Sequence, residues 1–184
     1  MKFILFEGID GSGKTTLAKK LADRVEGVYY DSPPECIRDI KEKGIITSDE
    51  IRLQYYLLGN IIASEEIKNI LKTNHVVCDR YIYSTMADHS VRLEREIRIN
   101  PNLLFPDYII YTKANLKIIE ERLLMRDGRI KKGEIKFLDK VAQKIEFLLR
   151  YDNELLLGNK NVIYVDTTNR DPEGLVDLIV KQIF

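Results

Sequence analysis

Short apolar runs rich in β-branched residues alternate with longer segments of helical periodicity along the 184 residues of the chain. This alternation is typical of a parallel sheet covered by helices on both faces, because parallel strands are joined through crossover segments. We predict strands at residues 2–7, 28–31, 75–79, 108–112 and 162–166. The predicted helices cover residues 14–25, 35–43, 48–73, 83–97, 116–125, 136–157 and 172–183. No repeat or flexible linker interrupts this order, so we expect one α/β domain over residues 1–184.

Composition narrows the class of protein. The 29 basic side chains equal the 29 acidic ones in number, whereas a general binder of nucleic acid polymers needs an excess of Lys and Arg. We find no apolar segment of the roughly 18 residues that a membrane helix needs, and the N-terminus lacks the pattern of a signal peptide. Two cysteines, Cys36 and Cys78, form neither a disulfide framework nor a metal cluster. We therefore expect a cytoplasmic protein without a membrane or nucleic acid partner, with Cys78 as a buried strand residue.

The segment "FEGIDGSGKTT" contains the pattern G-x-x-x-x-G-K-[ST] between a predicted strand and a predicted helix. Glycines let the backbone turn its N–H groups inward, so that the loop and the helix N-terminus surround phosphate groups. Lys14 is expected to reach the β- and γ-phosphates of ATP, and the Thr15 hydroxyl to bind Mg²⁺. The predicted nucleotide-binding residues here are Gly8, Ile9, Asp10, Gly11, Ser12, Gly13, Lys14, Thr15 and Thr16.

A second motif, "HVVCDRYIYS", places Asp79 at the end of an apolar run and Arg80 directly after it. In proteins with a phosphate loop, an acidic residue at the carboxyl end of a neighbouring strand completes the magnesium site. The alternative is that Asp79 caps the following helix. Because the phosphate loop is present, we favour a magnesium role for Asp79.

A third segment, "ERLLMRDGRIKK", spaces three arginines four and three residues apart. If the helix continued through them, Arg122, Arg126 and Arg129 would lie on one side of it, and a bound anion would relieve their repulsion. The glycines in this polar stretch also suggest a mobile loop. The alternative is a solvated basic face balanced by Glu120 and Glu121.

Taken together, these segments resemble the thymidylate kinase family of nucleoside monophosphate kinases. The similar segments are "FEGIDGSGKTT", "IRDIKEKG", "DRYIYSTMA", the arginine-rich stretch at residues 122–129, and "VDTT" at the last strand. They cover nearly the whole chain in the order of the family. The combination of the first and third segments is more specific than the phosphate loop alone.

The resemblance implies a P-loop NTPase fold with a five-stranded parallel sheet, helices on both faces and an arginine-bearing lid at about residues 126–136. It implies transfer of the ATP γ-phosphate to dTMP, with Mg²⁺, by a homodimer. Asp10 would contact the 3′-hydroxyl of the acceptor, and Arg80 the transferring and acceptor phosphates. Gly11 stands where some members have a catalytic arginine, so lid arginines, Arg126 or Arg129, would supply that charge, and Arg122 would contact the nucleotide.

The acceptor half departs from the family pattern. Asp31 stands where an arginine for the acceptor phosphate is usual, and Arg38 is the candidate to replace it. Tyr55 or Tyr56 would stack on the base while the other packs in the core, because adjacent helical residues point about 100° apart. Further departures are Gly59 and Asn60 in place of an Asp-Arg pair, and Asp88 and His89 in place of a Tyr-Gln pair. We expect Asp88 in the acceptor site and His89 as a surface or capping histidine.

A kinase of another nucleoside monophosphate stays open, and so do two further functions. A deoxynucleoside kinase would need a carboxylate near the 5′-hydroxyl, for which Glu7 is the candidate. A nucleotide-dependent regulatory ATPase is the alternative from another class. The segment "GNKNV" superficially suggests a guanine-binding motif, but Val162 stands where its Asp should be, which weakens that interpretation.

Overall fold

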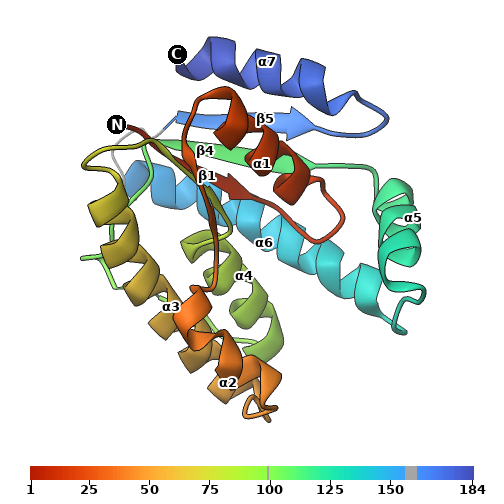
Figure 1. The fold of residues 1–184 in the computed structure, drawn as a ribbon. Helices are drawn as coiled ribbons and strands as arrows, with labels where there is room; N and C mark the ends of the chain where they lie inside the picture. The colour runs from red at the N-terminus through yellow and green to blue at the C-terminus, as the bar shows by residue number, and fades with distance from the viewer. Residues whose placement is uncertain (99, 156–160) are drawn as a thin grey trace.

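The computed structural model describes residues 1–98, 100–155 and 161–184 (Figure 1). Five strands form one sheet, in which every neighbouring pair is parallel and the order is β2-β3-β1-β4-β5. Their bounds are Phe3–Glu7 for β1, Val28–Asp31 for β2, Val76–Asp79 for β3, Tyr108–Lys113 for β4 and Asn161–Asp166 for β5. The five-stranded parallel sheet predicted from the alternating pattern is therefore confirmed.

Strand β1 lies at the centre of the sheet, and all five of its residues are buried. Because successive strand side chains point to opposite faces, Phe3 and Leu5 join one core cluster, whereas Ile4 and Phe6 join the other. A continuous apolar run is what a strand covered on both faces requires. Glu7 interrupts the run at its carboxyl end and is also fully buried.

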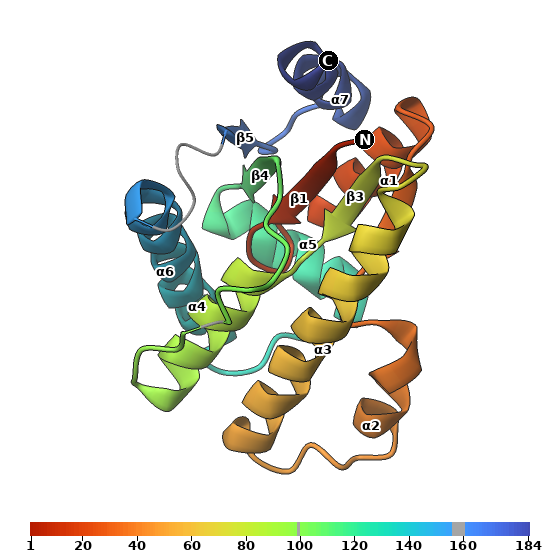
Figure 2. The same ribbon diagram turned by 90° about the vertical axis from the view of Figure 1, so that its left-hand side faces the viewer.

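Helices cover both faces of the sheet (Figures 1 and 2). Helices α1 (Lys14–Arg24) and α7 (Pro172–Ile183) pack side by side on one face. The other face carries α3 (Asp49–Ile70), α4 (Ile82–Leu93) and α6 (Glu134–Leu155), with α4 between the other two. Helix α5 (Leu116–Asp127) lies beyond the carboxyl end of β4. None of the helices that the structure describes is long and apolar enough to cross a membrane.

The predicted helix over residues 35–43 is a 3₁₀ turn, Glu35–Ile37, followed by the short α2, Arg38–Glu42. The predicted helix over residues 83–97 ends earlier, at Leu93, because Glu94 adopts a left-handed conformation with φ of 51°. The last two residues of the predicted helix at 136–157 lie outside the described residues. These differences concern helix ends, where local sequence patterns are least decisive.

Candidate active site

The loop between β1 and α1 has a backbone that two glycines make possible. Gly8 has φ of 145°, and a Cβ there would lie 2.4 Å from the Thr112 carbonyl oxygen. Gly13, at the N-cap of α1, is left-handed with φ of 86°. A side chain at either position would be strained. The glycine pattern therefore shapes the turn that leads into the N-terminus of α1.

Side chains hold the loop through its carbonyl groups. Four of these carbonyls accept a side-chain hydrogen bond. Arg80 donates to Gly8 and Lys14 to Ile9, while Arg122 donates to Gly11 and Thr167 to Ser12. The Ser12 hydroxyl also lies 2.8 Å from that of Thr112 on β4. The N–H groups of the first turn of α1 have no carbonyl partner within the helix. A loop with its carbonyls engaged and a helix N-terminus beside it favours an anion.

Lys14 is the cation inside the loop. Its side chain is 4% exposed and its Nζ donates to the Ile9 carbonyl at 2.8 Å. Burial and the positive charge of Arg80 lower the pKa of Lys14 to about 8, against the opposing effect of Asp79 and Asp10. A buried ammonium with one neutral acceptor gains a stronger partner when a phosphate enters the loop.

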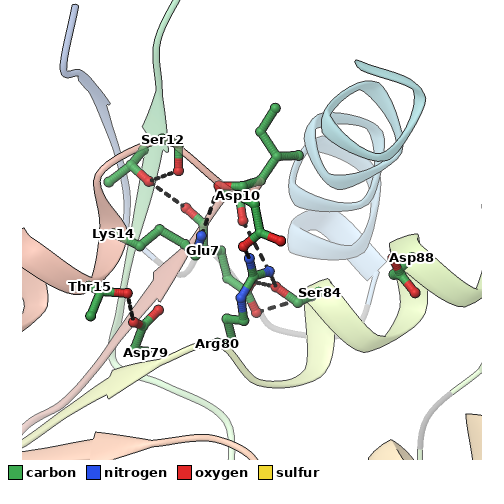
Figure 3. Close-up of polar contacts among 12 residues, drawn as sticks. Glu7, Asp10, Ser12, Lys14, Thr15, Asp79, Arg80, Ser84 and Asp88 are labelled. Carbon is green, nitrogen blue, oxygen red and sulfur yellow. Dashed lines mark hydrogen bonds and ion pairs between the residues drawn. The ribbon is translucent and has the colours of Figure 1, made fainter. Parts of the chain in front are cut away.

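Thr15 and Asp79 meet beside the loop (Figure 3). The Thr15 hydroxyl donates to Oδ2 of Asp79 at 2.5 Å. Oδ1 of the same carboxylate is buried and has no partner among the described residues. Protein oxygens hold Mg²⁺ at nucleotide sites through one or two carboxylates, together with waters and phosphate oxygens. A hydroxyl beside a carboxylate with a spare oxygen fits that donor set, so the residues present can hold Mg²⁺.

Arg80 and Asp10 form an ion pair across the loop. Nη2 of Arg80 lies 2.5 Å from Oδ1 of Asp10. Burial would raise the pKa of the Asp10 carboxyl, but the charges of Arg80 and Lys14 outweigh it, and the pKa is lowered. Arg80 adopts a left-handed backbone with φ of 69°, which is uncommon for a residue other than glycine. Such strain is found where function demands a particular geometry.

Two cavities meet at Asp10. The loop cavity has a volume of about 540 Å³, and its lining includes the loop, Arg122, Arg126 and Arg170. The α3–α4 cavity has a volume of about 790 Å³, and its lining includes Arg38, Tyr55, Tyr56, Arg80 and Asp88. Asp10 lines both cavities. Two ligands bound in these cavities would therefore approach each other at the Asp10–Arg80 pair.

The three arginines of the "ERLLMRDGRIKK" segment do not share one helix face. Helix α5 ends at Asp127, and Gly128 follows in a left-handed conformation with φ of 72°. Arg129 therefore lies exposed beyond the helix, and it lines neither cavity. Arg122 donates to Gly11 and Thr167. Arg126 is exposed, pairs with Asp127 and lines the loop cavity.

The predicted acceptor residues line the α3–α4 cavity together. Arg38 donates from Nε to the Pro33 carbonyl at 3.1 Å and from Nη2 to the Asp31 carboxylate at 2.9 Å. Tyr55 is 4% exposed and packs edge to face on Tyr56, with 5.1 Å between ring centroids. As predicted, one of the two tyrosines is a core residue, and Tyr56 is the more exposed one.

Comparisons with known sequences decide the family. The family model described as Thymidylate kinase matches residues 6–173. The chain belongs to the thymidylate kinase family. It is 34% identical, over 99% of its length and 95% of the relative's, to a protein of Methanococcus aeolicus named "Probable thymidylate kinase". A Methanocaldococcus jannaschii protein of the same name is 33% identical, over 97% of this chain and 93% of the relative. The resemblance inferred from the motifs is confirmed, and this is a family of nucleoside monophosphate kinases.

Solved structures show the same fold at lower identity. Thymidylate kinase from Candida albicans matches with a TM-score of 0.71 at 21% identity, over 99% of this chain and 90% of the other. Deoxyadenosine kinase from M. mycoides matches with a TM-score of 0.71 at 16% identity, over 98% of each chain. The predicted P-loop kinase fold is confirmed by these likenesses.

His89 of this thymidylate kinase family member is not a surface histidine. It is 1% exposed, and its Nδ1 lies 2.8 Å from the Thr85 carbonyl, so Nδ1 carries the proton and donates it. Its ring lies beside the Tyr56 ring, with 5.4 Å between centroids. The prediction of a surface or capping role was wrong because α4 packs between α3 and α6, which buries faces that a local pattern would leave exposed. Cys78 is fully buried, as predicted.

Three further arginines of the kinase line the two cavities. Arg52 and Arg92 line the α3–α4 cavity, and Arg170 lines the loop cavity. Arg92 pairs with Asp88 at 2.6 Å, and both Arg52 and Arg92 lie 3.8 Å from Asp49. No motif or spacing marks these residues. Their place in the site depends on how the helices pack.

Two features bear on the alternative functions. Glu7, the candidate base of a deoxynucleoside kinase, lines neither cavity, and its carboxylate accepts hydrogen bonds from Tyr81 and Ser84. Of the "GNKNV" segment, residues 158–160 lie outside the described residues, and Asn161 and Val162 belong to β5. Glu7 is therefore engaged with protein donors rather than directed at a ligand.

Proposed function

We propose that this kinase transfers the γ-phosphate of ATP to dTMP and forms dTDP, within one domain over residues 1–184. The observation that carries the proposal is the meeting of the two cavities at Asp10, beside Arg80. A donor nucleotide in the loop cavity and an acceptor in the α3–α4 cavity would present their phosphates to each other there. Holding two reactants in line accounts for much of the catalysis of phosphoryl transfer.

On the donor side, Lys14 neutralises the β- and γ-phosphates, and the loop with Gly8, Gly11 and Gly13 surrounds them. Thr15 and Asp79 would hold Mg²⁺, which neutralises phosphate charge when bound. Arg122 donates to the Gly11 carbonyl of the loop. Its contribution to nucleotide binding is therefore to keep the loop in shape.

On the acceptor side, Arg80 contacts the transferring and acceptor phosphates, and Asp10 receives the 3′-hydroxyl on its second oxygen. Tyr56 is the half-buried aromatic that can stack on the base, because Tyr55 is buried. Arg38 lies on the same wall and contributes charge for the acceptor phosphate. Asp88 forms an ion pair with Arg92, and both residues line the cavity.

Residues 126–136 form the lid in this proposal. Arg126 lines the loop cavity and is exposed. Its partner is the Asp127 carboxylate, which a phosphate group can replace. Arg129 would need to move toward the cavity to act. Arg126 is therefore the first candidate for the charge that develops on the transferred phosphoryl group.

We also propose a cytoplasmic homodimer. The exposed side of α3 presents Ile51, Leu58 and Ile61, each more than 40% exposed, although the opposite side of α3 is buried in the core. A helix that is apolar on both sides favours a second partner. Both cysteines are free thiols, which suits a reducing compartment. Molar mass by light scattering tests the dimer, and Leu58→Lys should give a monomer.

The experiment that tests the function measures ADP formation from ATP with and without dTMP, dUMP, UMP, CMP and AMP. A kinase releases ADP only when an acceptor is phosphorylated, and dTMP should be the preferred acceptor. ADP release that no acceptor stimulates would favour the regulatory ATPase instead. Phosphorylation of thymidine rather than dTMP would favour a nucleoside kinase.

A further inference from the structure

Glu7 is a buried carboxylate that the proposed function does not use. It is the last residue of the apolar strand β1 and has 0% exposure. An ionised carboxylate in such a place is costly unless hydrogen bonds compensate for the lost water. Oε1 accepts from the backbone N–H groups of Tyr81 at 3.1 Å and Ser84 at 3.2 Å, and Oε2 accepts from the Ser84 hydroxyl. Glu7 therefore binds the first turn of α4 (Figure 3).

The Ser84 hydroxyl links Glu7 to Arg80. It carries one proton, which it donates to Glu7, and its oxygen accepts from Nη1 of Arg80 at 3.2 Å. A protonated Glu7 would donate to Ser84 instead, and the serine proton would lose the acceptor that it has in the structure. Burial raises the pKa of Glu7 above its ordinary value, and the Ser84 hydrogen bond and the charge of Arg80 offset only part of that rise. When Glu7 is ionised, the Ser84 hydroxyl and Nη1 of Arg80 each have an acceptor.

Arg80 is held from two sides. Nη2 binds Asp10 at 2.5 Å, whereas Nη1 binds the Ser84 hydroxyl and the Gly8 carbonyl. Its backbone N–H donates to the Phe6 carbonyl of β1 at 3.0 Å. Asp10 therefore holds Nη2 of the guanidinium, and the Ser84 hydroxyl, which Glu7 orients, holds Nη1. A planar group held at both ends keeps one orientation.

We propose that Glu7 is a positioning residue for phosphoryl transfer, acting on Arg80 through the Ser84 hydroxyl. Glu7 lines neither cavity and so does not touch a substrate. By accepting the serine proton, it leaves the serine oxygen free to accept from Arg80. The guanidinium is thereby aimed at the junction of the two cavities before nucleotides bind. This inference rests on the proposed function of Arg80.

Glu7→Gln tests the inference. The introduced amide can keep the two backbone N–H bonds on its oxygen, but its nitrogen donates to Ser84, so the serine oxygen faces two donors. We expect kcat to fall by about tenfold to 100-fold, the scale of one hydrogen bond to a charged group, with little change in the KM for ATP. Glu26→Gln, on an exposed turn, is the matched control. A kcat equal to that of the wild type would overturn the inference.

A double-mutant cycle separates positioning from a merely structural role. If Glu7 acts through Arg80, Glu7→Gln should lower kcat in the wild type but hardly at all in an Arg80→Ala background. Equal losses in both backgrounds would overturn the inference. If Glu7→Gln does not fold, as judged by thermal unfolding, Ser84→Ala takes its place in the same cycle. The same non-additivity with Arg80→Ala is then expected.

A structural measurement keeps this inference distinct from the proposed function. If the wild type phosphorylates no nucleotide, the proposed function fails, but crystal structures of wild type and Ser84→Ala or Glu7→Gln still report the side chain of Arg80. We expect the Nη1 contact with residue 84 in the wild type and a turned guanidinium in the variants. An Arg80 side chain that keeps its place in both variants would overturn the inference.

Discussion

The hydroxyl of Thr15 lies 2.5 Å from Oδ2 of Asp79, although 64 positions separate the two residues in the sequence. Parallel pairing of β1 with β3 causes this meeting, because it brings the carboxyl ends of both strands to the same edge of the sheet. Oδ1 of Asp79 is buried without a partner among the described residues. The pair therefore offers a hydroxyl and a carboxylate oxygen of the kind that Mg²⁺ prefers.

Asp79→Asn should raise the Mg²⁺ concentration needed for half-maximal rate by about tenfold or more, because the amide keeps the shape but loses the charge that attracts the metal. The measurement is the rate as a function of free Mg²⁺ at saturating ATP. Asp166→Asn, an exposed aspartate at the end of β5, is the control. An unchanged magnesium dependence would show that Asp79 does not hold the metal.

Arg126→Ala should lower kcat more than it changes nucleotide affinity, since the guanidinium would neutralise charge that develops only in the transition state. Such arginines are worth roughly 10³ to 10⁵ in rate. Arg129→Ala should have a smaller effect, because Arg129 lies outside the loop cavity. Steady-state kinetics of both variants check this. Losses confined to KM in both would indicate ground-state binding only.

The sequence could predict those parts of the site that depend on local patterns. The glycines of the loop, Lys14 and Thr15 lie within one short segment, and Asp79 ends a predicted strand. The pairing of that strand with β1 skips β2 and does not follow from the order of the elements. The end of α5 was also readable, because Gly128 directly after Asp127 is a helix stop signal. The predicted helix over residues 116–125 ends two residues before Asp127, the last residue of α5.

Other parts depend on packing between distant segments. Nothing near Arg122 indicates that its donors go to Gly11, 111 positions away. His89 stands in a polar stretch, yet α4 is covered by both α3 and α6. Arg52 and Arg92 reach the α3–α4 cavity only because α3 and α4 pack together. One sequence holds no signal for such contacts.

Protein stability should fall as the pH is lowered from about 7.5 to 5.5. Burial lowers the pKa of His89 below its ordinary value of 6.5, despite the opposing effect of the Thr85 carbonyl and Asp88. Below pH 6.5 the histidine of the unfolded chain binds a proton that buried His89 does not bind. The free energy of unfolding present above pH 6.5 is therefore partly lost as the pH falls.

Urea unfolding at several pH values measures this dependence. His89→Gln should flatten the slope, and part of it should remain because burial also lowers the pKa of His75. His75→Gln is the matched comparison. Identical slopes for wild type and His89→Gln would show that His89 does not cause the effect.

Acceptor selectivity should be modest. Asn60 is buried and donates to Thr85, and Arg52 and Arg92 lie near the carboxylates of Asp49 and Asp88. If these side chains keep their partners when the acceptor binds, small groups on the base decide the selectivity, and such groups are worth about 10- to 200-fold. We expect kcat/KM for dTMP to exceed that for dUMP or UMP within that range. A preference on the order of 10⁴ would mean that a polar side chain reads the base.

Transfer of label from [γ-³²P]ATP is the most direct test of the central claim, that the two cavities bring two nucleotides together at Asp10 and Arg80. With dTMP present, the account predicts labelled dTDP in equal amount to ADP, no ADP without an acceptor, and neither product from Lys14→Ala. Label released as inorganic phosphate at a rate independent of dTMP would contradict it.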